Sequence, residues 1–265
     1  MTVDHGSGPE NNVLTSLERG LAVLLSFELD RSPLTLSEVA RATGLDRSGA
    51  RRLLHSLVLR GYVRTERAAY ALHPRVLEIG NAYLASLALP EIAQPHFAEV
   101  SRLLDESVSM AVLDGDEIVY VARVPVGRLM SLTLSVGSRL PAYPTALGRV
   151  LLSARPEDWL DRYLTSASFA PYTALTVTDR SRLRRELARI RRQGWAVVDQ
   201  ELEVGLLSLA VPIRDASGAT VAAINVSSHT SRFTSAELVD AGLRTLRLAS
   251  ERIESVLHME RPRGA

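Results

Sequence analysis

Apolar residues recur at helical spacing in three stretches near the start of the chain. Their apolar positions are Leu14, Leu17, Leu21, Leu24 and Leu25, then Leu36, Val39 and Ala40, and then Ala50, Leu53, Leu54, Leu57 and Val58. Thr35 and Glu38 form a T-x-x-E capping box at the start of the second stretch, and Asp46 can cap the third. Gly44 and Gly61 follow the last apolar turns, where glycine commonly ends a helix. The pattern predicts three helices, of which the second is short.

The residues after the third helix complete a small module. Residues 62–72 have the pattern of two short antiparallel strands around a turn. Three helices followed by a hairpin are the layout of a winged helix-turn-helix, which we place at residues 13–75. The polar residues 1–12 before it are expected to form a disordered tail. Residues 76–89 carry apolar positions at helical spacing and predict a linker helix that ends near Pro90.

Residues 90–258 follow another pattern, in which helices alternate with β-rich segments. The segments with the strongest strand pattern are Ser107–Asp114, Ile118–Val124, Leu207–Arg214 and Thr220–Ser227. They form two pairs, each joined by an Asp- and Gly-containing turn, as in β-hairpins. Amphipathic helices are expected at residues 145–153, 179–193 and 235–257. The whole chain therefore predicts an α+β fold, whose larger domain is an antiparallel sheet of five or six strands with helices on its faces.

The composition excludes several kinds of chemistry. The 31 basic residues of this 265-residue chain are all arginine, and they balance 30 acids to a net charge of +1. Without lysine, the chain cannot form a Schiff base, a Walker-type phosphate loop or a protein-kinase site. Without cysteine, it has no disulfides, thiolate metal sites or cysteine nucleophiles.

No pattern of catalytic residues stands out either. The sequence lacks the G-x-S-x-G, G-x-G-x-x-G and H-E-x-x-H motifs, and its six histidines are far apart. We therefore expect no catalytic residues, no metal site and no cofactor, and the protein is not expected to be an enzyme. No apolar run reaches the ~18 residues of a membrane helix, and the start lacks the apolar core of a signal peptide. A cytoplasmic protein without a membrane partner is the expectation.

The third helix carries the clearest candidate chemistry. Between Arg47 and Arg64 there are five arginines and no acid. The polar face of the helix is suited to the major groove of double-stranded DNA, because guanidinium groups pair with guanine edges and with phosphates. A solvated basic helix is the alternative explanation. The residues predicted to contact DNA, including a helix-start threonine and two wing arginines, are Thr35, Arg47, Ser48, Arg51, Arg52, His55, Arg64 and Arg67.

Polar residues on the predicted sheet indicate a ligand site in the larger domain. The helix that starts near Thr145 offers free N–H groups at Ala146 and Leu147, where an anion can bind. Asn225 and Ser227 share one face of an otherwise apolar strand, and Ser208 lies at the matching place on its partner. Two explanations stay open: these groups satisfy one another or a buried water, or they bind a small carboxylate.

Three long segments resemble the IclR family of bacterial transcriptional regulators. They are LTLSEVARATGLDRSGARRLLHSLVLRGYV at 34–63, VGSRLPAYPTALGRVLL at 136–152 and QGWAVVDQELEVGLLSLAVPIRD at 193–215. The phrases IVYVARV and SRLPAYPTALGRVLL are most similar to the branch that controls aromatic-acid and β-ketoadipate pathway genes. The resemblance implies a winged helix-turn-helix, a linker helix and a GAF-like effector-binding domain.

The resemblance also implies function and site residues. A member of this family is an effector-responsive regulator that binds a palindromic DNA operator as a homodimer or homotetramer and senses a small organic acid, here an aromatic or dicarboxylic one. Residues matched to the family's effector pocket are Leu129, Leu132, Leu140, Ala146, Leu147, Val198, Leu206, Ser208, Asn225 and Ser227, with Arg123, Tyr143 and Glu201 as further candidates. The alternative is a GAF-like small-molecule sensor or adaptor without sequence-specific DNA binding. The sequence leaves open the effector, the operator and the sign of regulation.

Overall fold

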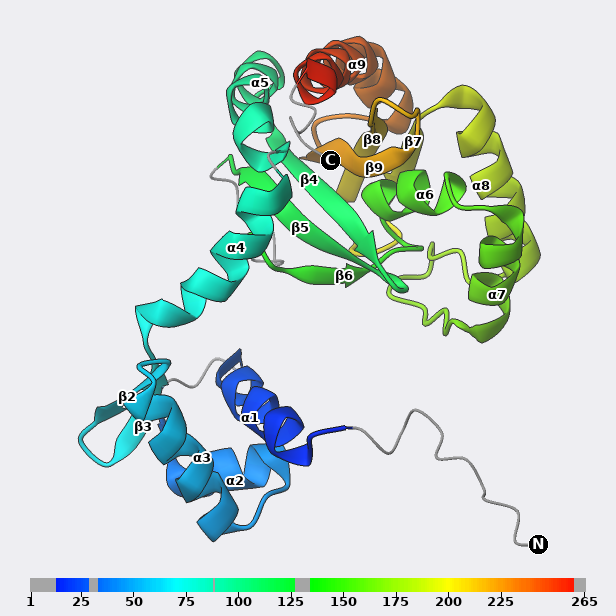
Figure 1. The fold of residues 1–265 in the computed structure, drawn as a ribbon. Helices are drawn as coiled ribbons and strands as arrows, with labels where there is room; N and C mark the ends of the chain where they lie inside the picture. The colour runs from blue at the N-terminus through cyan, green and yellow to red at the C-terminus, as the bar shows by residue number, and fades with distance from the viewer. Residues whose placement is uncertain (1–12, 29–32, 88, 127–133, 260–265) are drawn as a thin grey trace, which may run out of the picture. The chain divides into compact units, whose positions relative to one another are not determined.

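The computed structural model describes residues 13–28, 33–87, 89–126 and 134–259. Its contacts divide the chain into two compact units, Met1–Tyr83 and Leu84–Ala265. Figure 1 shows a small N-terminal unit of short helices and a larger unit built on one sheet. The dividing point falls inside a helix, which the sequence predicts as a linker at residues 76–89.

The described residues of the N-terminal unit up to Leu72 form three α-helices and a small three-stranded sheet. Its elements are α1 (Thr15–Leu25), the 3₁₀ turn η2 (Ser26–Glu28), β1 (Leu34–Thr35), α2 (Leu36–Thr43), α3 (Arg47–Leu59), β2 (Val63–Glu66) and β3 (Ala69–Leu72). The strand order is β1-β3-β2, and both pairs are antiparallel. A core that includes Val23, Val39, Ala50 and Leu54 holds the helices together. The predicted winged helix-turn-helix layout is confirmed.

Local signals in the sequence set the ends of these helices. Thr35 and Glu38 form the predicted capping box, and Gly44 ends α2 with a φ of 67°. The Asp46 carboxylate accepts the Gly49 N–H at 2.7 Å, and this hydrogen bond is the main reason why the pKa of Asp46 lies below its usual value. Gly61, with a φ of 76°, follows the end of α3. The turn between α2 and α3 is therefore fixed by short-range hydrogen bonds.

A 3₁₀ turn, η3 (Pro74–Val76), leads into α4 (Leu77–Leu87). The larger unit then contains α5 (Leu89–Leu104), β4 (Ser107–Asp114), β5 (Glu117–Val124), β6 (Arg139–Pro141), α6 (Ala146–Ser153), α7 (Glu157–Ser166), α8 (Arg180–Gln193), β7 (Ala196–Asp199), β8 (Leu206–Arg214), β9 (Thr220–His229) and α9 (Ser235–Met259). The six strands described in this unit pair antiparallel in the order β6-β5-β4-β9-β8-β7.

Helices cover both faces of this sheet, as Figure 1 shows. One face packs against α5 and α9 in a core that includes Phe97, Met110, Leu209 and Leu246. The other face packs against α6, α7 and α8, through residues such as Leu147 and Leu187. The predicted α+β architecture is confirmed. The sequence reasoning did not find β6, β7 or α7, because the two strands span only three and four residues and α7 carries no capping motif.

The start of α6 lies unusually close to the segment before it. A side chain at Gly148 would place its Cβ only 2.0 Å from the Ala142 carbonyl oxygen, so that only glycine fits there. Thr145 caps α6 by accepting the Gly148 N–H at 2.9 Å, and its own hydroxyl donates to the Ala142 carbonyl. This contact fixes the N-terminus of α6 on the sheet face that carries the polar residues described below.

Candidate functional site

The outer face of α3 is basic and exposed. Arg47, Arg51, Arg52 and His55 all lie on the surface, as does Ser48 in the first turn. On the opposite side, Ala50 and Leu54 are fully buried. A Cβ at Gly49 would lie 3.3 Å from the Asp46 carboxylate, so that the glycine fits the capping interaction closely. The helix thus has the buried stripe and the polar stripe that the sequence predicts.

The other predicted DNA-contact residues, Thr35, Arg64 and Arg67, differ in whether their side chains already have partners. Thr35 is exposed at the start of α2, where its hydroxyl takes part in the capping box. Arg67 is exposed at the turn of the hairpin with a φ of 54°. Arg64 is also exposed, but its guanidinium pairs with Glu66 at 2.5 Å within the same strand. Contact between Arg64 and another molecule would therefore compete with an existing ion pair.

In the larger unit, a cavity lies between the sheet and the N-terminus of α6. Together with the open solvent at its mouth, it spans about 560 Å³ of space between atoms. The lining residues are Tyr120, Arg123, Leu134, Leu140, Pro144, Thr145, Ala146, Leu147, Val198, Glu201, Leu202, Leu206, Ser208, Asn225 and Ser227. Five strands and α6 therefore contribute to a single cavity.

The floor of the cavity is a polar patch on an apolar sheet face. Strand register sets Ser109 directly opposite both Arg123 and Asn225, and sets Ser208 opposite Ser227. Asn225 is 3% exposed, and its amide nitrogen donates to the hydroxyls of Ser208 at 2.7 Å and Ser227 at 2.8 Å. The amide oxygen of Asn225 is buried without a hydrogen-bond partner among the described residues. A buried polar atom without a partner is costly unless another molecule satisfies it.

Two further lining side chains lie on β5. The Arg123 guanidinium donates to the Ser109 hydroxyl at 3.0 Å, and its Nε is buried without a partner among the described residues. Burial lowers the pKa of Arg123 from its usual value. Burial also raises the pKa of Tyr120 to about 12, so that its phenol stays protonated at neutral pH.

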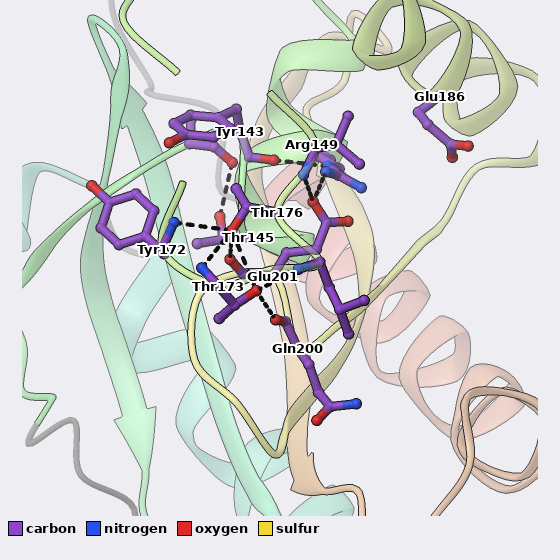
Figure 2. Close-up of polar contacts among 12 residues, drawn as sticks. Tyr143, Thr145, Arg149, Tyr172, Thr173, Thr176, Glu186, Gln200 and Glu201 are labelled. Atoms are coloured by element: carbon purple, nitrogen blue, oxygen red, sulfur yellow. Dashed lines mark hydrogen bonds and ion pairs between the residues drawn. The ribbon is translucent and has the colours of Figure 1, made fainter. Parts of the chain in front are cut away.

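A buried ion pair holds Glu201, which lines the cavity (Figure 2). Arg149 on α6 is 3% exposed, and it pairs with Glu201 at 2.5 Å and donates to the Tyr143 carbonyl at 2.8 Å. The same Glu201 carboxylate accepts the Val177 N–H at 2.8 Å. Glu201 lies in the segment between β7 and β8, and its carboxylate connects this segment to α6 and to the loop after α7.

Two threonines hold that loop in place. The hydroxyls of Thr173 and Thr176 donate to the carbonyls of Gln200 and Glu201, both at 2.6 Å. Figure 2 shows these contacts around Glu201. The cavity wall at residues 200–202 is therefore fixed by side chains from distant parts of the sequence.

The cavity brings together ten of the predicted pocket residues: Arg123, Leu140, Ala146, Leu147, Val198, Glu201, Leu206, Ser208, Asn225 and Ser227. Leu129 and Leu132 lie outside the described residues. Tyr143 is not among the residues that line this cavity, and its contact with an effector stays a prediction. Its hydroxyl donates to the Ala170 carbonyl and its ring packs against Phe169, so that it faces the loop after α7.

Sequence reasoning missed Tyr120, Leu134, Pro144, Thr145 and Leu202 as lining residues, and Arg149 as the partner of Glu201. Tyr120 and Arg149 stand inside segments that the resemblance singles out, IVYVARV and ALGRVLL. No local signal could have paired Arg149 with a carboxylate 52 positions away.

A winged helix-turn-helix joined to a domain with a polar-floored cavity is the architecture of a two-domain transcriptional regulator. Residues 16–67 match the IclR helix-turn-helix domain, and residues 81–255 match the C-terminal domain of the bacterial transcriptional regulator IclR. The chain belongs to the IclR family of bacterial transcriptional regulators.

Known proteins similar to the chain support this assignment over nearly its full length. The Pca regulon regulatory protein of Pseudomonas putida is 46% identical over 89% of this chain and 82% of its own. A transcriptional regulator from Rhodococcus sp. RHA1 is 48% identical, with a TM-score of 0.84 over 92% of this chain and 98% of its own. An IclR homologue from Microbacterium hydrocarbonoxydans in complex with 4-hydroxybenzoate is 29% identical, with a TM-score of 0.82 over 92% and 99% of the two chains.

The family and these relatives are transcriptional regulators and not enzymes, in agreement with the expectation from the sequence. Among the described residues, no three His, Asp or Glu side chains come together in a way that would hold a metal ion. No helix in the described part of the chain is long and apolar enough to cross a membrane.

The buried ion pair gives a first prediction. Replacing Arg149 with Met leaves the Glu201 carboxylate buried without its cation, and we expect this to destabilise the larger unit by about 3–5 kcal/mol. Arg139→Met is the matched control, because Arg139 pairs with Asp114 and Glu117 on the surface and should cost at most about 1 kcal/mol. Denaturant unfolding measures both. Equal losses for the two variants would contradict the role given to the buried pair.

Proposed function

We propose that this protein is an effector-responsive regulator that binds a palindromic DNA operator and senses a small organic acid in the cavity of its larger unit. The observation that carries the proposal is the cavity itself. The buried Asn225 amide oxygen lacks a partner among the described residues, and the cavity is also lined by Ala146 and Leu147 at the N-terminus of α6. The N-terminus of α6 suits a carboxylate, whereas the Asn225 oxygen is an acceptor and suits a hydroxyl of the ligand, in keeping with the 4-hydroxybenzoate bound to the Microbacterium homologue.

The geometry at α6 explains how a carboxylate would bind. The Gly148 N–H is used by the Thr145 hydroxyl and the Arg149 N–H by the Thr145 carbonyl. The N–H groups of Ala146 and Leu147 then remain as the donors of the first turn. Two backbone donors and the positive end of a helix dipole favour an anion, and no protein cofactor or metal is needed for such binding.

For DNA, the proposal assigns base and phosphate contacts to the exposed face of α3. Arg51 and Arg52 are exposed in the middle of that face, and Arg47 and Ser48 lie at its N-terminus. Two copies would place their α3 helices in successive major grooves, about 34 Å apart. Arg67 would contact the DNA backbone from the hairpin. Arg64 could make such a contact only by breaking its ion pair with Glu66.

Self-association through the N-terminal unit is the third part of the proposal. Four leucines, Leu14 at the N-cap of α1 and Leu17, Leu21 and Leu25 within the helix, are between 49% and 70% exposed. An apolar row of this kind on a short helix suits a symmetric contact with a second copy. A homodimer, or a tetramer built from dimers, is therefore proposed, and the chain is expected to work in the cytoplasm.

The proposed DNA contacts of α3 can be tested by charge removal. Arg51→Ala combined with Arg52→Ala should weaken binding to duplexes selected by the wild-type protein from a random pool by about tenfold or more. Wild-type affinity should fall steeply as salt rises, because phosphate contacts release counterions. Fluorescence anisotropy measures both. The control is Arg182→Ala with Arg185→Ala, which removes two exposed arginines from α8. Unchanged affinity in the α3 variant would favour the sensor or adaptor alternative.

The α1 surface can be tested by sedimentation. Leu17→Ser with Leu21→Ser should convert the protein to monomers and weaken operator binding, because it removes apolar area from the proposed interface. Leu59→Ser serves as the control, since Leu59 is 72% exposed at the end of α3. A variant that sediments like the wild type would place the contact between copies elsewhere.

The effector site can be tested by ligand-induced stabilisation. Benzene- and alkane-carboxylic acids, including 4-hydroxybenzoate and adipate, should be compared in a thermal-shift panel with their amides. At least one acid should raise the melting temperature by mass action, whereas its uncharged amide should not. If no acid in the panel stabilises the protein, or if the amides act as well as the acids, the carboxylate site is wrong.

A further inference from the structure

A second cavity opens between the β4–β5 turn, β6, α7 and the loop after α7. Together with the open solvent at its mouth, it spans about 410 Å³ of space between atoms. Its lining residues are two acids, three tyrosines and three small residues, namely Asp116, Glu117, Pro141, Tyr143, Tyr163, Ala167, Ser168 and Tyr172. The segment 140–144 separates it from the first cavity, because Leu140 and Pro144 line the first one. Among the described residues, the two cavities have no lining residue in common.

Aromatic rings are concentrated around this second cavity. The chain holds only two tryptophans, seven tyrosines and four phenylalanines. The rings of Tyr143 and Tyr172, which Figure 2 shows next to each other, have centroids 6.3 Å apart. Phe169 packs against Tyr143 at 5.0 Å and against Tyr163 at 5.8 Å. Ring faces are negative and attract cations, and the Arg180 guanidinium already lies 5.8 Å from the centroid of Phe169 outside the cavity lining.

The charged groups at this cavity are all acidic. Among its described lining residues there is no arginine and no histidine. Arg139 pairs with both Asp114 and Glu117, each at 2.7 Å, so that two carboxylates share one cation. Asp116 is exposed in the same turn and forms no ion pair with any described residue. The turn therefore leaves an excess of negative charge beside the tyrosine rings.

Tyr163 adds a buried polar atom to the lining. The residue is 5% exposed, and its hydroxyl has no hydrogen-bond partner among the described residues. The Tyr143 hydroxyl differs, since it donates to the Ala170 carbonyl. Burial raises the pKa of Tyr163 above its usual value, so that its phenol stays neutral and its oxygen can accept a hydrogen bond. A buried hydroxyl of this kind is costly unless a molecule in the cavity satisfies it.

We propose that this cavity is a second ligand site and that it binds a small organic cation of the alkylammonium class. The tyrosine rings would contact the cation through their faces, and Asp116 would supply the counter-charge. The Tyr163 oxygen would accept a hydrogen bond from an N–H or O–H group of the ligand. A bare metal ion suits the site less well, because no three described acidic or histidine side chains come together to hold one.

The first test compares ligands that differ in charge and hardly in shape. Choline is paired with 3,3-dimethylbutan-1-ol, in which a carbon replaces the charged nitrogen, and butylammonium is paired with butan-1-ol. Calorimetric titration of the full-length wild-type protein measures all four. At least one cation should bind about tenfold or more tightly than its neutral partner, because the rings and the carboxylate favour the charge.

Two substitutions then assign the preference to the cavity. Asp116→Asn should weaken binding of the preferred cation by about tenfold and leave its neutral partner within about twofold, and asparagine suits a turn as well as aspartate does. Tyr172→Leu removes a ring that is 48% exposed and should weaken the cation about fivefold. Asp240→Asn, an exposed change on α9, is the matched control and should leave both affinities as in the wild type. A melting curve of each ligand-free variant establishes that it is folded.

Every result supports or overturns the second site. If no cation binds the wild type, or if the neutral partners bind as tightly, the site is overturned. A preference that either cavity variant leaves intact, or that Asp240→Asn also removes, overturns its assignment to this cavity. Loss of the preference in both cavity variants and its survival in the control support the proposal. These titrations involve neither DNA nor acids, so that they succeed or fail independently of the proposed regulator function.

Discussion

The contact between Arg149 and Glu201 is the interaction on which the cavity depends. Both side chains are almost fully buried, and an ion pair in that environment persists only when its remaining donors and acceptors are satisfied. Here the Tyr143 carbonyl and the Val177 N–H complete the set. The pair fixes the direction of α6, and with it the N–H groups that face the cavity. Because α6 also approaches the chain closely at Gly148, its N-terminus has little freedom to shift.

The two faces of the sheet in the larger unit differ in polarity. The face that packs on α5 and α9 is largely apolar, which suits a role in holding the domain together. The opposite face is apolar under α6 and α8 but polar beside them, where Ser109, Asn225 and Ser208 follow one another across neighbouring strands. Burying these groups weakens the fold unless they have partners. The polar groups at the cavity therefore lower the stability of the fold, and they are available to bind a ligand.

Local chemistry explains why the N-terminal unit follows from its sequence so closely. The capping box at Thr35, the Asp46 cap and the glycines after α2 and α3 act within four residues, so that each can be read without knowing the rest of the fold. The exposed basic face of α3 follows in turn, because helical spacing alone separates it from the buried Ala50 and Leu54. The ion pair of Arg64 is a feature of this unit that the sequence did not predict. Its pairing with Glu66 depends on side-chain conformation, which periodicity does not determine.

The sequence by itself determined the fold class, the two-unit order, the main strands and three residues of the sheet floor, Ser208, Asn225 and Ser227, because alternation and helical periodicity assign faces to side chains. The long family segments supplied the regulator class. Only the tertiary structure decided that the Tyr143 hydroxyl donates to the Ala170 carbonyl, that Arg149 neutralises Glu201, and that Arg123 keeps an unpaired charge. Each of these depends on which distant segments meet, and electrostatic pairing over 52 positions leaves no periodic trace in the chain.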